Sequence, residues 1–417
     1  MRKYIGLMGI IGFMGILPIG PVNAILAQNS DRFPDSIDKD FQPKGARDLR
    51  DNSVYLQVDG RTFFIDNEYF GDRVSGYTLP GFVLQPKVGW HANDKFTLKG
   101  GVHWLYYWGA RDYPATTAYG AYPLYDSAAG SMHLLPWLQA RIDFSNHLWL
   151  TLGNLSPSSH FLPLPLYNSE LTMVGDPEAG AKLEWNTRWA VGEVWVDWRE
   201  YIWDRSPVPE RFTAGLSGGL RDTHDLWTLY MPLFFVVQHE GGQNMSVSHN
   251  INNNFNAGGG LGVTLGDRKG PGVLDLSCRG LWYHQHGNAA IPFSSGWGIY
   301  PELEIFVNSY NNKWRFLASY WYGKDFVPLL GSWHFSNLSA NTPGLTFDRT
   351  RVITLQLEWQ WQVFPDDAYH LHLYGTLYHY LPSTGTFADG TTMEYGHRNQ
   401  FSIGASLSFY PTIRLHY

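Results

Sequence analysis

The stretch Phe401 to Tyr417, which reads FSIGASLSFYPTIRLHY, decides how the rest of the chain is interpreted. Its odd positions are nearly all apolar, from Phe401 and Ile403 to Leu415 and Tyr417, whereas its even positions are mainly small or polar. Successive side chains of a strand point to opposite faces, so this period of two predicts a strand with one apolar face. Such a strand fits either a membrane barrel or the edge of a soluble β-sandwich.

The preceding segments repeat one unit, which is a strand, a short turn, a second strand and a long loop. For example, Tyr77 to Trp90 and Phe96 to Trp108 are joined by a tight turn, and a long loop follows. Short turns at one end and long loops at the other are typical of transmembrane β-barrels. The sequence therefore predicts an all-β, antiparallel up-and-down barrel of about 16 strands, or about 14 if Val54 to Phe70 stays outside the wall.

The composition and the faces of the strands favour a barrel over a sandwich. Charged residues make up 16% of the chain, against roughly 25% in an average soluble domain. In Val352 to Val363 the odd positions are apolar and the even positions are polar. Aromatic residues such as Trp90, Trp149 and Trp314 gather near strand ends, where rings at the level of lipid headgroups are expected.

The N-terminus predicts export. Residues 1–27 combine Arg2 and Lys3 with an apolar run and a small residue at a cleavage site, which is typical of a signal peptide. Residues 28–52 read as a flexible periplasmic leader, and residues 53–417 as the outer-membrane barrel with both termini periplasmic. The formal charge of -7 makes nucleic acid a poor partner, and a single Cys278 excludes an intrachain disulfide and a Cys-based metal site.

Three short segments resemble a known family. Asn67 to Phe70, Gly76 to Leu79 (with Phe82 and Pro86) and Trp195 to Trp198 resemble segments of porin-like outer-membrane β-barrels of the Bacteroidota type. The end of the chain is similar to the closing strand of such barrels, whose assembly signal ends on an aromatic residue. The resemblance implies contact with outer-membrane lipid and with the barrel-assembly machinery, for which Ile413, Leu415 and Tyr417 are the expected signal, and it leaves room for other outer-membrane subunits.

If the apolar face is outward, charged residues of both signs line the lumen. These lumen-lining candidates are Lys87, Lys99, Arg141, Asp143, Lys182, Glu184, Glu193, Asp197, Arg199, Arg211, Asp275, Arg279, Glu302, Glu304, Arg315 and Glu358. Because the signs balance, the sequence predicts either weak charge selectivity or cross-strand ion pairs that narrow the channel.

The loop Ser156 to Pro177 is too apolar for a freely solvated outer loop. Its constriction candidates are Phe161, Leu162, Leu164, Leu166 and Tyr167. By analogy with trimeric porins, whose third outer loop folds inward, this loop is a candidate constriction or plug. Packing against a partner or against the rim of the barrel is an equal alternative.

No catalytic signature, metal site or cofactor is expected from the sequence. His284 and His286 share a strand face, as do His370 and His372, but no third metal ligand is identifiable. The sequence therefore predicts a barrel that is not an enzyme and that passes small solutes in the manner of a porin. The alternative is an accessory barrel with a closed lumen in a larger outer-membrane complex, and a barrel enzyme is the third possibility.

Overall fold

The computed structural model describes most of the chain from Asn52 onward. The described residues are 52–108, 116–117, 120–121, 132–156, 158–200, 209–242, 251–266, 272–288, 290–309, 311–363 and 369–416. The predicted signal peptide, nearly all of the predicted leader and Tyr417 lie outside these residues.

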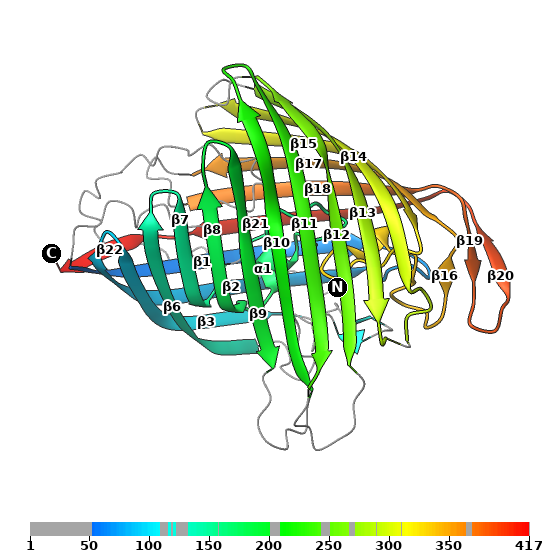
Figure 1. Cartoon of the computed structure of the whole chain (residues 1–417), viewed down its shortest axis with the longest axis horizontal. Coiled ribbons are helices and arrows are strands. Elements are labelled where there is room, and N and C mark those ends of the chain that lie inside the picture. The colour runs from blue at the N-terminus through cyan, green and yellow to red at the C-terminus, as the bar shows by residue number, and fades with distance from the viewer. Residues whose placement is uncertain are drawn as a thin grey trace, which may run out of the picture.

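Within the described residues, 16 strands form the wall, and the last is divided in two (Figure 1). They are β1 (Ser53–Glu68), β2 (Tyr77–Asn93), β3 (Phe96–Tyr107), β6 (Met132–Ser145), β7 (Leu148–Asn154), β8 (Ala179–Asn186), β9 (Ala190–Glu200), β10 (Glu210–Thr223), β11 (Trp227–Gly241), β12 (Asn252–Leu265), β13 (Gly272–His286), β14 (Ser295–Ser309), β15 (Asn312–Lys324), β17 (Thr350–Gln362), β18 (Tyr369–Tyr380) and the divided strand β21 (Arg398–Phe409) with β22 (Thr412–His416). The elements outside the wall are β4 (Thr116–Thr117), β5 (Gly120–Ala121), α1 (Leu171–Val174), η4 (Trp333–Phe335), β16 (Thr346–Phe347), β19 (Ser383–Thr386) and β20 (Thr392–Tyr395).

Each wall strand pairs antiparallel with the next, and β1 closes the barrel. On one side β1 pairs with β2, and on the other it pairs with β21 and β22. Because β1 lies in the wall, the alternative of 14 strands is wrong, and the predicted up-and-down barrel of 16 strands is confirmed. Closure gives every described strand of the wall a neighbour on both sides, which is the condition for a sheet to cross a lipid bilayer.

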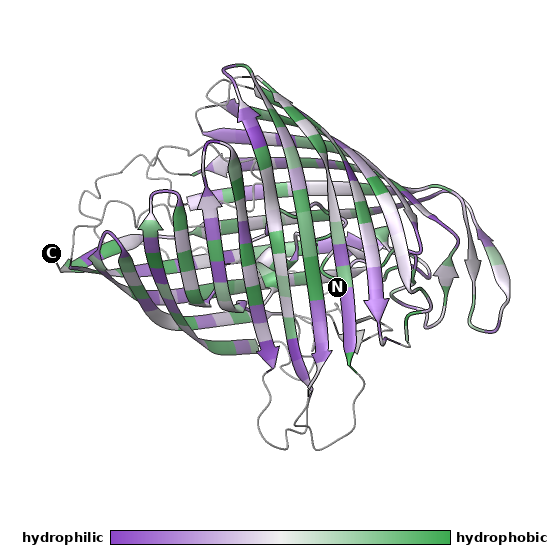
Figure 2. Cartoon of the chain, in the orientation of Figure 1, coloured by the Kyte–Doolittle hydropathy of each residue, from purple (hydrophilic) through white to green (hydrophobic). Residues whose placement is uncertain are grey.

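The two faces of the wall differ as the alternation predicts. Along β17, Ile353, Leu355 and Leu357 are exposed on the outer face, while Thr354 and Gln356 are buried on the inner face. Figure 2 shows the same alternation of apolar and polar residues along neighbouring strands. Among the described residues, no helix has the length and apolar character needed to span a membrane.

The closing strand is interrupted where the sequence places Pro411. β21 ends at Phe409 and β22 begins at Thr412, and β21 pairs with both β18 and β1, whereas β22 pairs with β1. Proline has no backbone N–H to donate, so it cannot take part fully in a central ladder. The missing donor of Pro411 therefore accounts for the interruption between β21 and β22.

Two loops at the same end of the barrel fold inward, and we call them the inner loops (residues 155–178 and 325–349). Leu166 and Tyr167 of the first and Phe326 and Phe335 of the second are buried in one hydrophobic cluster. Inward side chains of the wall, such as Trp195, belong to the same cluster. We call this end the long-loop end, and the opposite end, where β2 turns into β3, the short-turn end.

Candidate functional site

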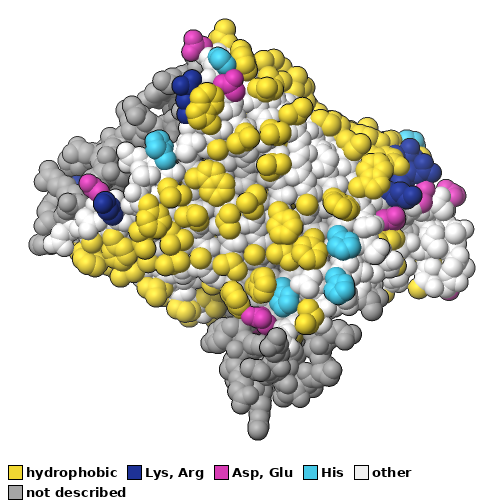
Figure 3. Space-filling model, viewed as in Figure 1, with side chains coloured by type: hydrophobic (Ala, Val, Ile, Leu, Met, Phe, Trp, Pro, Cys, Tyr) yellow, Lys and Arg dark blue, Asp and Glu magenta, His cyan; other side chains and the backbone are white. Residues whose placement is uncertain are grey.

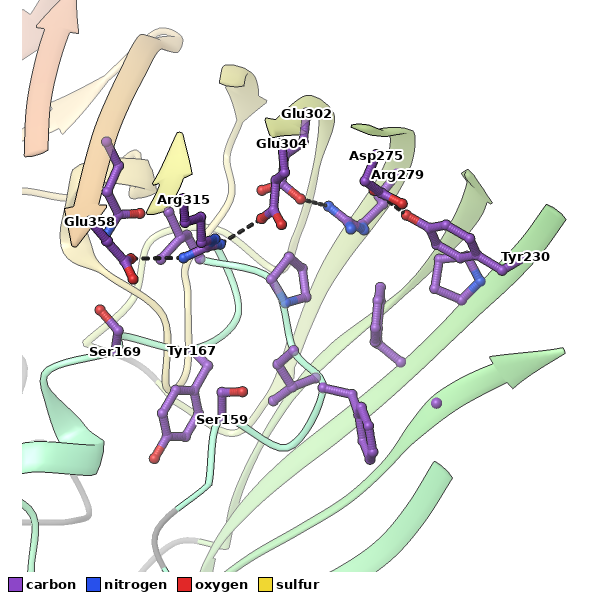
Figure 4. Close-up of a pocket in the computed structure, with 18 residues that line it drawn as sticks. Ser159, Tyr167, Ser169, Tyr230, Asp275, Arg279, Glu302, Glu304, Arg315 and Glu358 are labelled. Carbon is purple, nitrogen blue, oxygen red and sulfur yellow. Dashed lines mark hydrogen bonds and ion pairs between the residues drawn. The ribbon is translucent and has the colours of Figure 1, made fainter. Parts of the chain in front are cut away.

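On the side of β11 to β17, the inner face carries a chain of paired charges (Figure 4). Arg315 bridges two carboxylates, with Nη2 2.5 Å from Oε1 of Glu304 and Nη1 2.8 Å from Oε1 of Glu358. Arg279 donates to Glu302 at 2.6 Å, one strand away. These groups face Phe161 and Leu164 of the first inner loop across a cavity of about 110 Å³.

The opposite side of the wall carries a second set of paired charges. Lys87 lies 2.8 Å from Asp59 and sits over the ring of Trp137 at 3.7 Å. Lys182 lies 3.5 Å from Glu184 and 3.8 Å from Glu193. Two further close pairs are Arg141 with Asp143 and Arg199 with Asp197, each at 2.6 Å.

The charges predicted to line the lumen all lie at positions of inward parity in the wall, and Arg211 is the one among them at the long-loop rim. The side chain of Arg211 is 45% exposed at the long-loop end, where it pairs with Glu240 at 3.1 Å and Glu200 at 3.7 Å. Arg211 lies opposite Glu240 in the unbroken register of β10 with β11, and the register shift against β9 leaves its inward parity unchanged.

His160 fixes the first inner loop to β9. Its ring stacks on Trp195 with centroids 4.0 Å apart, Nδ1 lies 2.5 Å from Glu193, and Nε2 lies 2.9 Å from both oxygens of Glu178. Burial alone lowers the pKa of His160, but the two carboxylates outweigh burial and raise the pKa to about 9. His160 therefore carries a proton at neutral pH and holds two acidic groups together.

Two acidic residues fix the same loop to other strands. Glu170 accepts from Asn67 Nδ2 at 2.8 Å and from the hydroxyl of Tyr77, which ties the loop to β1 and β2. Asp176 lies 2.8 Å from Nδ1 of His133 on β6. Burial raises the pKa of Asp176, but hydrogen bonds from His103 and His133 outweigh it and lower the pKa to about 2.

The inner loops also contact each other. The backbone N–H of Asn168 donates to Leu330 at 2.8 Å, and Ser332 donates to Leu164 at 3.3 Å. The constriction candidates take part in this packing: Leu162, Leu166 and Tyr167 are buried, whereas Phe161 and Leu164 are half-buried and line the cavity. Whether the inner loops narrow a conducting path stays a prediction.

A carboxylate and a hydroxyl meet on the outer face at the long-loop end, and we call this pair the rim pair (Asp66 and Thr78). These residues lie directly opposite each other on β1 and β2, and Thr78 Oγ1 donates to Asp66 Oδ1 at 2.7 Å. A second carboxylate, Glu68, lies two residues along the same face of β1. A charged group that faces lipid is costly except near the interface, so this position indicates the level of the headgroups.

Aromatic residues on the same outer face extend from the rim pair toward β3. Phe82 of β2 packs edge-on against Trp104 with ring centroids 4.9 Å apart, and Tyr106 packs against Trp108 at 5.1 Å. No pattern in the sequence singles out the rim pair, because neither residue belongs to a known catalytic motif. Asp66 and Thr78 become neighbours only through the register of β1 with β2.

The C-terminal assembly candidates lie on the outer face of β22 as far as the structure describes them. Ile413 and Leu415 are exposed, and Tyr417 lies outside the described residues. Recognition of these residues by the barrel-assembly machinery stays a prediction. Among the described residues, no group of three or more His, Cys, Asp or Glu side chains is arranged to hold a metal ion.

Solved structures similar to this chain are outer-membrane proteins of low sequence identity. The in-vitro folded OmpT of Vibrio cholerae is 10% identical, with a TM-score of 0.46, and the match covers 87% of this chain and 99% of that one. OccAB4 of Acinetobacter baumannii is 9% identical, with a TM-score of 0.47 and the same coverage. OpdK of Pseudomonas aeruginosa is 9% identical, with a TM-score of 0.45, covering 86% of this chain and 99% of that one. No curated protein matches the chain.

A family model described as lipid A 3'-O-deacylase-type matches residues 45–416, which is nearly the whole barrel. This description names an enzyme, so the prediction from the sequence that the barrel is not an enzyme is contradicted. The resemblance to outer-membrane β-barrels is confirmed. The chain is an outer-membrane β-barrel that belongs to the lipid A 3'-O-deacylase-type family.

Proposed function

We propose that this protein is a hydrolase that releases an ester-linked acyl chain from a lipid A-type glycolipid. The family match over residues 45–416 supports this reaction class. The structural observation that carries the proposal is the rim pair, a carboxylate and a hydroxyl 2.7 Å apart on the outer face of the wall. Reacting groups on the outer face can meet a membrane lipid directly, so the lipid does not have to enter the barrel.

The proposal includes an orientation. We infer that the long-loop end faces the cell exterior and that the short-turn end, with both termini, faces the periplasm. The short turns that join β2 to β3 and β14 to β15 support this orientation, since outer-membrane barrels keep short turns on the periplasmic side. The rim pair then lies at the outer leaflet.

The two groups of the rim pair have complementary roles in ester cleavage. Asp66 accepts the proton of the Thr78 hydroxyl while Oγ1 attacks the carbonyl carbon of the ester. The bond between that carbon and the sugar oxygen breaks, and the sugar oxygen leaves as an alcohol with the proton from Asp66. Water then hydrolyses the acyl ester on Thr78, which releases the fatty acid and restores the hydroxyl. Phe82 and Trp104 offer an apolar surface for the acyl chain.

Hydrolysis of purified lipid A tests the proposal. The full-length protein in detergent micelles is expected to release a free fatty acid, detected by mass spectrometry. Asp66→Asn is expected to slow the release about 100-fold or more, because general base catalysis commonly contributes that factor. Thr78→Ala is expected to abolish the release, whereas Thr78→Ser retains a hydroxyl and is expected to keep part of it.

Thr62 provides the matched control for these variants. It lies on β1, on the same outer face, and it is exposed opposite Phe82. Thr62→Ala should leave hydrolysis unchanged. Full activity of Thr78→Ala in a correctly folded barrel would show that the rim pair is not the reacting site, and absence of any released fatty acid from the unmodified protein would reject the proposed reaction.

Porin-like passage of small solutes with weak charge selectivity is the second candidate function. The observation that favours it is an inner face lined by charges of both signs, from Lys87 and Asp59 to Arg315 and Glu358. The contacts between the inner loops favour a small conductance. They also favour the alternative of an accessory barrel with a closed lumen in a larger complex. Both functions are compatible with hydrolysis at the rim, because they use the other face of the wall.

Conductance in planar bilayers tests the second candidate. Deletion of Leu162 to Leu166 is expected to raise single-channel conductance if the first inner loop blocks a path through the barrel. A deletion of equal length in the hairpin of β19 and β20, outside the wall, serves as the control. Equal, near-zero conductance of the intact and deleted proteins would remove the porin-like candidate.

A further inference from the structure

A group of cations faces outward at the long-loop end, several strands from the rim pair. Lys324 ends β15, Arg349 precedes β17, and Arg351 is the second residue of β17. Arg351 shares the outward parity of Ile353 and Leu355, and Lys324 shares that of Trp314 and Phe316. We call Lys324 and Arg351 the cation pair. Figure 3 shows Lys and Arg side chains gathered at this edge of the molecule, with Asp and Glu side chains and large hydrophobic residues beside them.

The neighbours of the cation pair place it at the level of the headgroups. Lys324 lies opposite Trp297 on β14, and Arg351 lies opposite Tyr322 on β15. The rings of Trp297 and Tyr322 lie 5.5 Å apart on the outer face. Amphipathic rings favour the boundary between the hydrocarbon and the headgroups, so cations beside them meet the charged part of a lipid.

The cation pair has N–H groups that can still donate hydrogen bonds to an anion. Nε of Arg351 is buried and Nη2 donates to the backbone oxygen of Pro382, so Nη1 is the nitrogen that remains for an anion. Lys324 is exposed and has no ion-pair partner within the described part of the chain. Arg349 differs, because its Nε lies 2.8 Å from Asp348, which neutralises it locally. A guanidinium and an ammonium on one surface suit the oxygens of a phosphate group.

The spacing around the wall relates the cation pair to the rim pair. From β17 the wall continues through β18 and β21 to β1. Three steps between strands of about 4.8 Å each separate Arg351 from the strand of Asp66. The register places Asp66 level with Leu357 of β17, so the two sites are also offset by roughly 20 Å along the strands and lie about 24 Å apart. One disaccharide head group does not span this distance, so binding at the cation pair is independent of the rim pair.

We propose that Lys324 and Arg351 bind a phosphate of a phosphorylated glycolipid in the outer leaflet. This binding does not depend on the proposed hydrolysis. The ligand is a lipid phosphate rather than free phosphate, because the site faces the bilayer and adjoins the rings of Trp297 and Tyr322.

Binding of defined glycolipids to the purified full-length protein tests this inference. Lipid A with its phosphates is expected to bind at least about tenfold more tightly than the same glycolipid without phosphate, since a charge-assisted contact commonly accounts for that factor. The double variant Lys324→Gln, Arg351→Gln is expected to abolish this preference, and Lys324→Arg to retain it. Heat-modifiable migration in a denaturing gel verifies that each variant is folded.

Two controls separate the inference from the proposed reaction. Arg188→Gln removes an exposed cation at the short-turn end, beside Trp189, and should leave lipid binding unchanged. Asp66→Asn should bind phosphorylated lipid A as tightly as the unmodified protein. Loss of the phosphate preference in the double variant supports the site even if no fatty acid is ever released. An undiminished preference in that variant, or no preference in the unmodified protein, would overturn it.

Discussion

Charged side chains lie in opposite environments inside the barrel and at its outer rim. Inside, Arg315 is buried between Glu304 and Glu358, and both of its terminal nitrogens are engaged. At the rim, Lys324 is exposed and has no ion-pair partner within the described residues. An uncompensated buried charge is very costly, so the interior charges must pair, and removing one partner destabilises the wall. Rim charges have water and lipid headgroups as partners, so they remain available to a ligand.

The largest expected effect concerns the interior. Arg315→Met leaves Glu304 and Glu358 buried without their common partner, and we expect a loss of about 3–5 kcal/mol in the free energy of unfolding. Urea unfolding of the barrel in detergent or lipid vesicles measures the loss. The triple variant Arg315→Met, Glu304→Leu, Glu358→Leu removes every charge of the bridge and should recover most of the stability. If the single variant is as stable as the unmodified protein, the bridge is not structural.

A smaller effect is expected from the titration of His160, which joins the interior to the first inner loop. Its pKa in the folded protein is about 9, raised above the ordinary value of 6.5. The stabilisation is therefore complete below pH 6.5 and is lost as the pH rises through 9, by up to about 3 kcal/mol. The melting temperature should fall between pH 7 and pH 10. His160→Gln should lower it at pH 6 and lose this pH dependence, and a parallel fall in both proteins would contradict the assignment.

The wall was predictable from the sequence because its periodicity is local. The alternation in β17 and β21 assigns each residue to a face, and Pro411 marks the interruption between β21 and β22. Trp149 shows the limit of this reasoning. A tryptophan near a strand end suggested the headgroup level, but Trp149 is buried inside the barrel and donates from Nε1 to Glu184 at 2.7 Å. In β7, which has 7 residues, leucines at 148, 150 and 152 take the outer face instead.

The contacts that build the candidate sites depend on register and on loops, which no local pattern encodes. The pairing of Asp66 with Thr78 requires the alignment of β1 with β2, and the contacts of His160 require the first inner loop to fold back onto β9. The apolar sequence of that loop did indicate that it avoids water. Nothing in the sequence of residues 325–349 signalled the inward fold of the second inner loop, whose Phe326 and Phe335 are buried by contacts with distant strands.

The smallest expected effect concerns Arg211, which has the same chemistry as Arg315 in the opposite environment. Both are arginines flanked by two glutamates, but Arg211 is 45% exposed, and Glu240 and Glu200 lie 3.1 and 3.7 Å away. Water screens this group, so Arg211→Gln should change the free energy of unfolding by only about 0–1 kcal/mol, and less at high salt. Urea unfolding in parallel with Arg315→Met measures the difference. Equal losses in the two variants would show that burial does not govern the contribution of charge in this barrel, because the two sites share their residue types and differ mainly in solvent access.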